Sequence, residues 1–185
     1  ETNRFAPNSP YSASKTSSDL LVRAWHKTYK IPVITTNCCN NFGFWQFPEK
    51  LIPVIISNCI KKNQIPIYGN GQNIREWIFV EDHVDALIKI FKKGVIGEVY
   101  NIGSGYEISN IKLTNKICNI FDKLTENHNS SKNLITFVKD RSGHDYRYAI
   151  NSNKIKKEFN FKIRNSFEID LQKTIQWYLK NSKWL

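Results

Sequence analysis

Tyr11 and Lys15, four residues apart, are the pair in this sequence best suited to proton transfer. On a helix, side chains at this spacing project from the same face about one turn apart, so both head groups can reach one site. An ammonium group stabilises a phenolate by its opposite charge. The pair could therefore make a general base from tyrosine, a side chain that is normally inert.

The residues that precede this pair favour a functional site. A tyrosine and a lysine at this spacing are also common on solvated helix faces, and the spacing alone favours that structural explanation. However, Ser9-Pro10 is typical of a helix start, with serine as the N-cap and proline at the first helical position. Tyr11 and Lys15 are therefore predicted in the first turns, where sites are commonly built.

Two polar stretches could supply further groups. Residues 37–43 are predicted as an asparagine-rich loop after a short strand, where ligands bind in open α/β sheets. An ordinary asparagine-rich turn explains them equally well. Residues 140–145 set three charges and a histidine around a glycine, which indicates binding. A salt-bridged surface turn is an equal explanation.

The elements that must position these groups begin as an α/β pattern. Leu20, Leu21 and Trp25 recur at helical spacing, which predicts an amphipathic helix that ends at Pro32. Residues 33–36 are β-branched throughout and predict a short strand in a parallel sheet. A helix followed directly by such a strand is typical of α/β proteins.

Further along, a very apolar helix is predicted to open at Pro48. Residues 65–68 and 75–80 are predicted as strands joined by a glycine turn, as in a hairpin. Residues 81–83 lead a helix. Its predicted inward side chains are Val84, Leu87, Ile88 and Phe91.

Strands and helices are also predicted to alternate in the rest of the chain. Strands are predicted over residues 98–102 and 134–138, and Ser109 or Asn110 caps a helix between them. Two helices that begin near Ser152 and Ser166 close the chain and are predicted to be structural.

Composition narrows the class of protein. The 185 residues are 41% apolar, as in globular proteins, and no apolar run approaches the roughly 20 residues that span a bilayer. The four cysteines lack the spacing of a zinc site or a disulfide framework. The net charge of +11 raises nucleic acid as a partner, but the lysines are scattered. We therefore predict a cytoplasmic protein that binds neither nucleic acid nor membrane.

Two Gly-x-Gly segments imitate a dinucleotide-binding loop. After Gly103-Ser104-Gly105, the third glycine of the fingerprint would fall at Ile108, and after Gly69-Asn70-Gly71 it would fall at Ile74. These 185 residues therefore contain no phosphate-cradling fingerprint.

Several motifs together resemble one enzyme superfamily and span nearly the whole chain. They are Ser9-Pro10-Tyr11-Ser12-Ala13-Ser14-Lys15, Asn37-Cys38 with Asn40-Asn41-Phe42-Gly43, Phe47-Pro48-Glu49-Lys50-Leu51-Ile52-Pro53, Pro66-Ile67-Tyr68-Gly69, Arg75-Glu76-Trp77, Val80-Glu81-Asp82-His83, Tyr100-Asn101-Ile102-Gly103, Asp140-Arg141 with Gly143-His144-Asp145, and Trp177-Tyr178-Leu179. In these motifs the chain resembles the extended short-chain dehydrogenase/reductases, and within them the nucleotide-sugar 4,6-dehydratases of the dTDP-glucose 4,6-dehydratase type.

This resemblance implies NAD as the cofactor and a nucleoside-diphosphate glucose, dTDP or UDP, as the substrate. Tyr11 would remove the proton of the sugar 4-hydroxyl while hydride leaves C4 for NAD, and Lys15 would hold the nicotinamide ribose. The resulting ketone acidifies the C5 proton, water is lost across C5 and C6, and the hydride returns to C6. The product would be the 4-keto-6-deoxy sugar nucleotide.

The resemblance also implies binding residues. Asn41 would lie against the nicotinamide end of NAD. The nucleotide-sugar site would be lined by Asn40, Lys50, Leu51, Pro66, Ile67, Tyr68, Arg75, Asn110, Asp140, Arg141, Ser142, Gly143 and His144. Arg75 suits the diphosphate because its planar fork can pair two oxygens, and Tyr68 suits the base. No metal is implied.

In fold, the resemblance implies the carboxyl-terminal part of a Rossmann-like parallel sheet with a smaller α+β substrate-binding domain. Residues 1–43 would end the NAD-binding domain. Residues 44–185 would mainly bind the nucleotide sugar, with some segments returning to the Rossmann sheet. A homodimer built partly on the Tyr-Lys helix is also implied, although an intramolecular core would show the same apolar stripe.

Three departures qualify the resemblance. These 185 residues contain neither the glycine-rich βαβ unit nor the Asp-Glu pair of such enzymes, and Ser142 stands where the family usually has proline. We therefore expect a carboxyl-terminal half that has no turnover and binds NAD weakly by itself. The alternatives are a nucleotide-sugar 4-epimerase or decarboxylase of the same superfamily, which needs no Asp-Glu pair, and a non-catalytic nucleotide-sugar-binding subunit.

Overall fold

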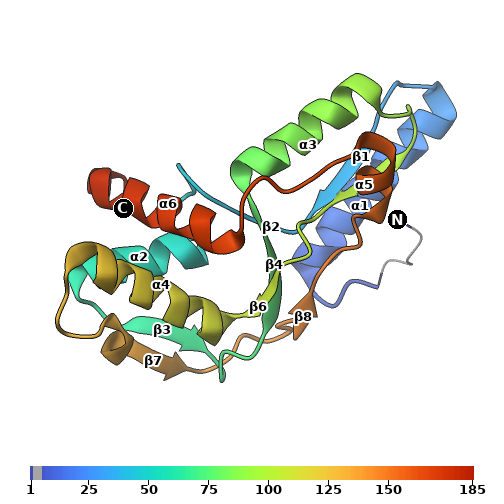
Figure 1. The fold of residues 1–185 in the computed structure, drawn as a ribbon. Helices are drawn as coiled ribbons and strands as arrows, with labels where there is room; N and C mark the ends of the chain where they lie inside the picture. Colours follow the sequence, from blue (N-terminus) through green and yellow to red (C-terminus); the bar gives the residue numbers. More distant parts are fainter. Residues whose placement is uncertain (2–5) are drawn as a thin grey trace.

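Parallel strand pairs set the framework of the fold (Figure 1). The computed structural model describes residue 1 and residues 6–185. In it, β1 (Thr35–Cys38) pairs in parallel with β5 (Val99–Ile102). β3 (Ile65–Tyr68) pairs in parallel with β7 (Ile135–Val138). These pairs agree with the predicted α/β class.

β4 (Ile74–Phe79) is the centre of a third sheet. It runs parallel to β2 (Asn40–Phe42) and to β8 (Arg147–Tyr148), and antiparallel to β6 (Glu107–Ser109). Segments from both halves of the chain therefore meet on one strand.

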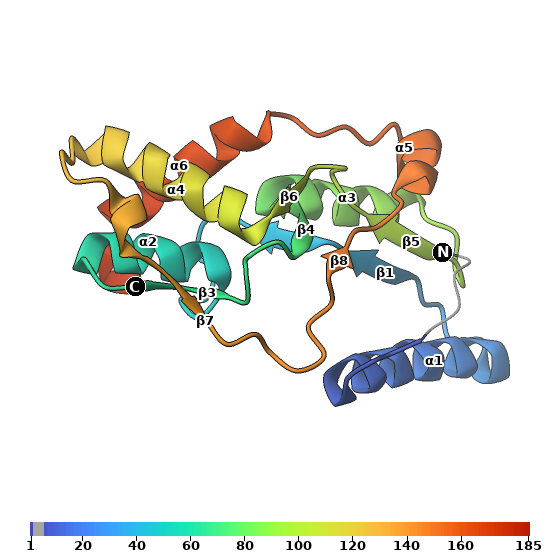
Figure 2. The ribbon, with the colours of Figure 1, turned by 90° about the horizontal axis from the view of Figure 1, so that it is seen from below.

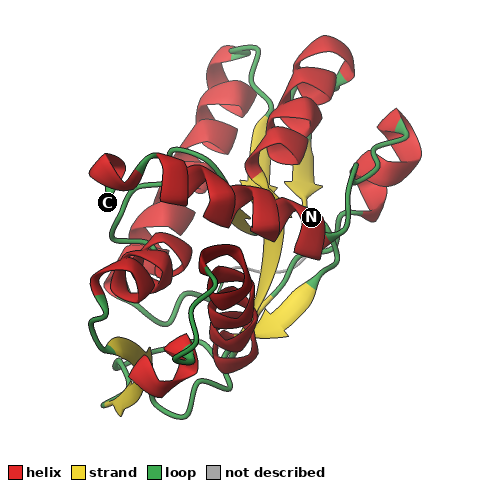
Figure 3. Ribbon diagram, turned by 60° about the vertical axis from the view of Figure 1, so that its left-hand side comes forward, coloured by secondary structure: helices red, strands yellow, loops and turns green. Residues whose placement is uncertain are grey.

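Helices surround these strands (Figure 3). Within the described residues they are α1 (Pro10–Tyr29), α2 (Leu51–Lys61), α3 (Val80–Lys93), α4 (Asn110–Thr125), η1 (Ser131–Leu134), α5 (Asn153–Phe159), α6 (Phe167–Lys180) and η2 (Ser182–Trp184). α2, α3 and α4 lie in connections between strands, as parallel pairing requires. No helix in the described part of the chain is long and apolar enough to cross a membrane.

α1 begins where Ser9-Pro10 predicts. The Ser9 hydroxyl accepts a hydrogen bond from the Ser12 backbone N–H at 3.1 Å, and Pro10 is the first helical residue. The predicted end at Pro32 is wrong. The helix ends at Tyr29 because Lys30 takes the left-handed conformation (φ 57°) and donates its N–H to the His26 carbonyl. The following strand begins correspondingly late, at Thr35.

The loop predicted over residues 37–43 is also wrong, because this stretch forms the end of β1 and then β2. Cys39 lies between the two strands, is buried, and donates its backbone N–H to the Ile102 carbonyl at 3.1 Å. Partners in β5 and β4 thus satisfy the backbone of a polar stretch, and local composition does not reveal such partners.

The hairpin predicted over residues 65–80 does not form, since β3 pairs with β7 while β4 pairs with other strands. The glycine turn between them explains why. Gly71 has a φ of 70°, and a Cβ built on it would lie 2.9 Å from the Cβ of Ile111. Its carbonyl accepts the Ile111 N–H at 2.9 Å. The turn therefore docks on the start of α4, and the two strands join different sheets.

Buried side chains form two clusters. The α2–α4–α6 core consists of Phe42, Ile52, Ile55, Ile56, Cys59, Ile65, Ile67, Trp77, Phe79, Ile108, Leu113, Ile117, Cys118, Phe121, Phe167, Leu171, Ile175 and Tyr178. The smaller α3–α5 core consists of Cys39, Ile78, Ala86, Ile90, Tyr100, Ile102, Ile155 and Phe161. β4 contributes Trp77 and Phe79 to the first core and Ile78 to the second, because successive side chains of a strand point to opposite faces.

Two helices differ in detail from their predictions. α2 is well buried as predicted, but it begins at Leu51 instead of Pro48. α3 buries the narrow stripe of Asp82, Ala86 and Ile90. Its predicted inward residues are instead exposed, and Phe91 is 89% exposed. The wider apolar face of α3 therefore has no cover within the described chain.

α1 is similarly uncovered. Figure 2 shows it on one side of the β1–β5 pair, with α3 and α5 on the other side. Within the described chain, no residue of α1 is buried, and Trp25 remains 51% exposed although its ring packs 4.8 Å from that of Tyr29. The apolar stripe of α1 is therefore not part of an intramolecular core among the described residues.

Candidate active site

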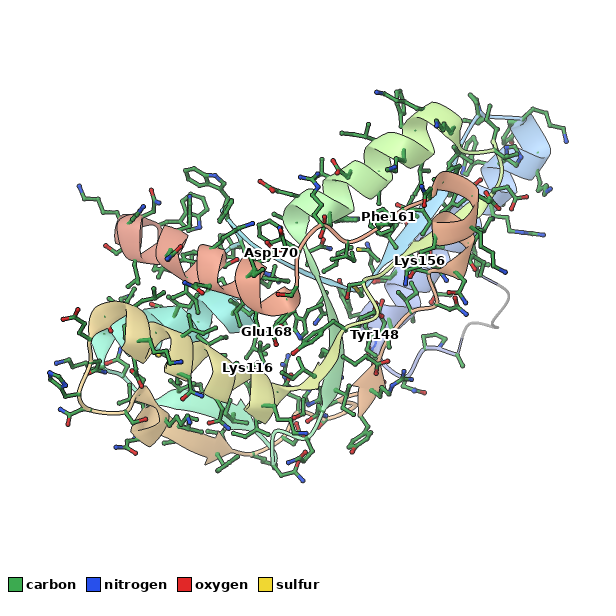
Figure 4. The ribbon with its side chains drawn as sticks, in the orientation of Figure 1. Lys116, Tyr148, Lys156, Phe161, Glu168 and Asp170 are labelled. Carbon is green, nitrogen blue, oxygen red and sulfur yellow. The ribbon has the colours of Figure 1, made fainter. Side chains whose placement is uncertain are left out.

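Tyr11 and Lys15 lie in the first two turns of α1, and both side chains are exposed. Tyr148, labelled in Figure 4, lies on β8, and its hydroxyl donates to the Cys38 carbonyl at 3.4 Å. Burial raises the pKa of Tyr148, and the nearby Cys38 and Tyr11 side chains add to the rise. A strand from late in the chain therefore brings a second phenol to the end of β1.

Lys50 adds a positive charge near Tyr11. It is the N-cap residue of α2, and its ammonium donates to the Glu49 carboxylate at 2.8 Å. This hydrogen bond is the main cause of the raised pKa of Lys50, to which Tyr11 also contributes. The residue is exposed, so its side chain is free to turn toward an anionic ligand.

Asn41, on β2, has a side-chain hydrogen-bond acceptor that lacks a donor among the described residues. Its amide nitrogen lies 3.4 Å from both the Cys39 carbonyl and the Cys38 thiol, while Gln46 donates to its backbone carbonyl at 2.9 Å. Its side-chain oxygen Oδ1 is buried and has no hydrogen-bond partner among the described residues. An orphaned acceptor fits a carboxamide donor such as the nicotinamide group of NAD carries. Asn40, the preceding residue, is half-buried.

Arg75 is held firmly on β4. Its guanidinium donates to the carbonyls of Asp145 at 2.8 Å and Ile74 at 2.7 Å. On the opposite face of the strand, the buried Glu76 accepts the N–H groups of Gly105 at 2.7 Å and Ile150 at 2.8 Å. Because Arg75 and Glu76 are adjacent on a strand, their side chains point to opposite faces, and the buried Glu76 holds the backbone of Gly105 and Ile150.

The loop of residues 140–144 completes this second group. The Arg141 guanidinium lies 4.5 Å from the centre of the Tyr68 ring, a cation–π contact. The Asp140 carboxylate binds the His144 ring at 2.7 Å, which is the main reason that the pKa of Asp140 is lowered. The pKa of Arg75 is lowered chiefly by burial, and the positive charge of Arg141 adds to this lowering. Two guanidiniums suit a diphosphate.

One contact joins the two groups. A Cβ built on Gly143 would lie 3.6 Å from the carbonyl oxygen of Asn8, which directly precedes the cap of α1. The loop that carries Arg141 and His144 therefore lies against the entrance of the Tyr-Lys helix. Residues 135 positions apart in sequence, Asn8 and Gly143, thereby line one region.

The other predicted site residues lie as follows. Asn110 is the first residue of α4, and its side-chain oxygen is buried without a hydrogen-bond partner among the described residues. Ile67 points into the α2–α4–α6 core and is 2% exposed, so only its backbone can face a ligand. Leu51 and Pro66 are half-buried, and Ser142 is exposed.

Three groups of this region are missing from the sequence-based prediction. The Tyr148 hydroxyl donates to the Cys38 carbonyl, the Arg75 guanidinium donates to the Asp145 carbonyl, and the Asn73 amide donates to that same carbonyl at 3.2 Å. β8 has only two residues, too few for a periodic signal, and a backbone carbonyl carries no signal in sequence at all. Only the pairing of β8 with β4 brings them to the site.

Comparisons with known proteins agree with this geometry. The family model for GDP-mannose 4,6 dehydratase matches residues 1–174. The dTDP-glucose 4,6-dehydratase of Shigella flexneri is 49% identical over 185 residues, which cover 100% of this chain and 51% of that protein. The chain thus spans about half the length of the curated relatives that it matches.

Solved structures show the same relationship. The dTDP-glucose 4,6-dehydratase of Bacillus anthracis in complex with NAD superposes with a TM-score of 0.91 at 44% identity, over 100% of this chain and 56% of that chain. DesIV, the dTDP-glucose 4,6-dehydratase of Streptomyces venezuelae with NAD and TYD bound, gives a TM-score of 0.91 at 40% identity, over 100% and 55%. The Rossmann-like α/β fold is thereby confirmed, and the chain belongs to the GDP-mannose 4,6-dehydratase family.

Proposed function

We propose that this chain supplies the Tyr-Lys pair and the nucleotide-sugar site of an NAD-dependent dTDP- or UDP-glucose 4,6-dehydratase. The observation that supports this proposal is the approach of the Gly143 loop to Asn8, because this loop also carries Arg141, whose guanidinium lies 4.5 Å from the centre of the Tyr68 ring. A base-stacking group, two guanidiniums and a proton-transfer pair then follow one another along one ligand. This order matches base, diphosphate and sugar.

Each residue then has a role in the reaction. Tyr11 takes the proton of the sugar 4-hydroxyl, and Lys15 stabilises the phenolate that this step requires. Bound NAD would supply the hydride acceptor for C4 and the hydride donor for C6. Asn41 and Lys15 hold its nicotinamide end, and Asn40 and Lys50 contact the sugar and its phosphate. These residues keep the sugar in one position while water leaves across C5 and C6.

The nucleotide part of the ligand uses the second group. Tyr68 stacks on the base, and the backbone of Pro66 and Ile67 runs beside it. Arg75 and Arg141 pair with the diphosphate oxygens, and Asn110 and His144 donate to the remaining ones. Leu51, Asp140, Ser142 and Gly143 complete the walls of the site.

Turnover needs groups that these 185 residues lack. Water loss requires an acid and a base, which an Asp-Glu pair supplies in the enzymes that the chain resembles, and no Asp-Glu dipeptide occurs in this sequence. The adenine half of NAD requires a glycine-rich unit, which is also missing. The chain covers about half the length of its relatives, and we propose that a Rossmann half provides both features.

The uncovered helix faces support two partners. We propose that the stripe of Leu20, Leu21 and Trp25 on α1 pairs with a second copy in a homodimer, and that the outer face of α3 packs against the Rossmann half. We also propose that residues 1–43 end the NAD-binding domain and that residues 44–185 mainly bind the nucleotide sugar. Four unpaired thiols suit a reducing compartment, which supports a cytoplasmic protein.

Nucleotide binding tests the proposal directly. We expect the 185-residue chain to bind dTDP or UDP in calorimetry without added NAD. Arg75→Ala should weaken this binding by about 10- to 100-fold, because it removes charge-assisted hydrogen bonds worth about 1.5–3 kcal/mol. Arg23→Ala, on the exposed surface of α1, is the matched control and should bind as the parent does. Equal affinities of the two variants would refute the assignment of Arg75.

Turnover gives a separate test. The purified chain should form no 4-keto-6-deoxy product from dTDP-glucose and NAD, because the dehydration acid and base are missing. Adding the amino-terminal half of a relative as a separate chain should restore product formation, and Tyr11→Phe should abolish it. Product formation by the chain alone would show that the acid and base lie within these 185 residues.

A further inference from the structure

The turn of residues 43–47 joins two residues of the candidate active site. Asn41 lies on β2 just before this turn, and Lys50 is the N-cap of α2 just after it. Within the turn, Trp45 takes the left-handed conformation (φ 61°), which a bulky side chain rarely adopts. Such a conformation persists only where the surrounding structure holds it. The contacts that hold this turn therefore also set the path of the chain between Asn41 and Lys50.

Two hydrogen bonds from the end of the chain converge on the backbone carbonyl of Gln46. This carbonyl accepts the Tyr178 hydroxyl at 2.9 Å and the Trp184 indole N–H at 3.1 Å. A carbonyl oxygen has two lone pairs, so the two donors satisfy it together. Figure 2 shows the carboxyl terminus beside α2, where the Lys61 ammonium donates to the Leu185 carbonyl at 3.2 Å. The end of the chain is thus anchored on α2 and bonds to the turn.

Aromatic rings of the same carboxyl-terminal segment pack against the turn. The centroid of the Trp45 ring lies 4.7 Å from that of Trp177 and 5.2 Å from that of Trp184, both in edge-to-face geometry. The Phe44 ring lies 6.0 Å from that of Trp177. Trp45 itself remains 64% exposed, so burial of its own side chain does not explain its left-handed backbone. The ring contacts and the two hydrogen bonds to Gln46 provide the explanation.

Further hydrogen bonds connect the turn to the candidate active site on both sides. Toward β2, the Gln46 side-chain amide donates to the backbone carbonyl of Asn41 at 2.9 Å. Toward α2, the Lys50 backbone N–H donates to the Phe47 carbonyl at 3.1 Å. A displacement of Gln46 would therefore be passed to Asn41 through its side chain and to Lys50 through the next residues of the chain.

From these contacts we propose that Tyr178 and Trp184 are positioning residues. Through the turn at Gln46 they hold Asn41 in place for the nicotinamide end of the cofactor and Lys50 in place for the sugar and its phosphate. The roles of Asn41 and Lys50 in this inference rest on the proposed function. The last helix, which the sequence predicts to be structural, then also positions the site.

Calorimetry of the 185-residue chain with two ligands tests this role. The double variant Tyr178→Phe with Trp184→Phe keeps an aromatic ring at both positions but removes both donors from the Gln46 carbonyl. It should bind dTDP-glucose about tenfold more weakly than the parent, because Lys50 is no longer held against the sugar phosphate. Thymidine monophosphate ends before the second phosphate and should bind to both proteins alike. Each single variant keeps one donor and should weaken dTDP-glucose binding about two- to fivefold, which preserves the test should the double variant not fold.

Tyr29→Phe is the matched control, because it removes the hydroxyl of an exposed tyrosine on α1. It should bind both ligands as the parent does. Unchanged affinity of the Tyr178 and Trp184 variants for dTDP-glucose would overturn the proposal. Equal weakening of dTDP-glucose and thymidine monophosphate would also overturn it, because such a result would show a general loosening of the fold instead of a displaced Lys50.

Nuclear magnetic resonance of the ¹⁵N-labelled chain without ligand separates this positioning role from the proposed function. In the double variant, the assigned backbone N–H signals of Asn41 and Lys50 should move, while that of Arg75 on β4 should stay in place. A parent chain that bound neither ligand would refute the proposed function, and these signals would then decide whether the end of the chain holds the turn. Unmoved signals of Asn41 and Lys50 would overturn the positioning role.

Discussion

The two cores of this chain differ in how completely they are covered. Around the α2–α4–α6 core, the three helices pack on one another, and residues such as Ile56 and Leu113 are fully buried. Around the α3–α5 core, the outer face of α3 and the whole of α1 remain open within the described chain. The first region can stabilise itself, whereas the second presents apolar surface that suits further protein.

This difference follows the division of function. The complete region carries Tyr68 and Asn110, which we assign to the nucleotide, and its packing holds them in place without further protein. The open region carries Tyr11 and Lys15 on a helix with no buried residue in the described chain. Binding of the nucleotide should therefore survive in the isolated chain, while catalysis should depend on what covers α1 and α3.

Core substitutions give the sharpest test of this contrast. Leu113→Ala removes a fully buried side chain of the complete region and should lower the free energy of unfolding by about 2–5 kcal/mol. Leu21→Ala, on the exposed stripe of α1, should change it by less than about 0.5 kcal/mol. Urea denaturation followed by circular dichroism measures both. Similar losses for the two variants would mean that α1 is covered in solution.

Measurements of dimerisation distinguish the open face of α1 from the open face of α3. Trp25→Glu places a charge on the α1 stripe and should weaken a homodimer by about 2–4 kcal/mol, a 30- to 1000-fold rise in the dissociation constant. Phe91→Glu makes the same change on α3 and should leave dimerisation unaltered. Analytical ultracentrifugation distinguishes a monomer of 21.6 kDa from its dimer. Loss of the dimer in the Phe91 variant alone would move the interface to α3.

Alkaline pH should lower the free energy of unfolding of the complete region by a smaller amount. Burial raises the pKa of Tyr178 to about 12, and its hydroxyl donates to the Gln46 carbonyl at 2.9 Å. The unfolded chain releases this proton near pH 10, so the stabilisation is full below about pH 10 and is lost as pH rises through about 12, by about 1–3 kcal/mol. Tyr178→Phe should unfold about 1 kcal/mol more easily at neutral pH and show a shallower alkaline loss.

The exposed Tyr29 on α1 supplies the control for this pH series. Tyr29→Phe should keep the alkaline slope of the parent, because its side chain lies on the exposed surface of α1 and loses no buried hydrogen bond. Urea midpoints measured from neutral to alkaline pH give the slopes. An unchanged slope in the Tyr178 variant would contradict the role assigned to its burial.

Much of the fold was predictable from local rules. The Ser9 cap, the strand at residues 65–68 and the burial of α2 follow from capping, flanking turns and apolar content, which are properties of neighbouring residues. The errors arose where partners are distant. Residues 37–43 form strands because β5 and β4 lie beside them, and the turn at Gly71 docks on α4 instead of closing a hairpin.

Sequence alone was sufficient for the Tyr11–Lys15 pair at a helix start and for membership of the dehydratase family, because both depend on residues close together in the chain. Tertiary structure decided which face of α3 is buried, that Tyr148 and the Asp145 carbonyl reach the site, and that Tyr178 and Trp184 bond to Gln46. These features join segments up to 138 residues apart, as in the bond from Trp184 to Gln46. Such contacts depend on strand pairing, which local patterns do not specify.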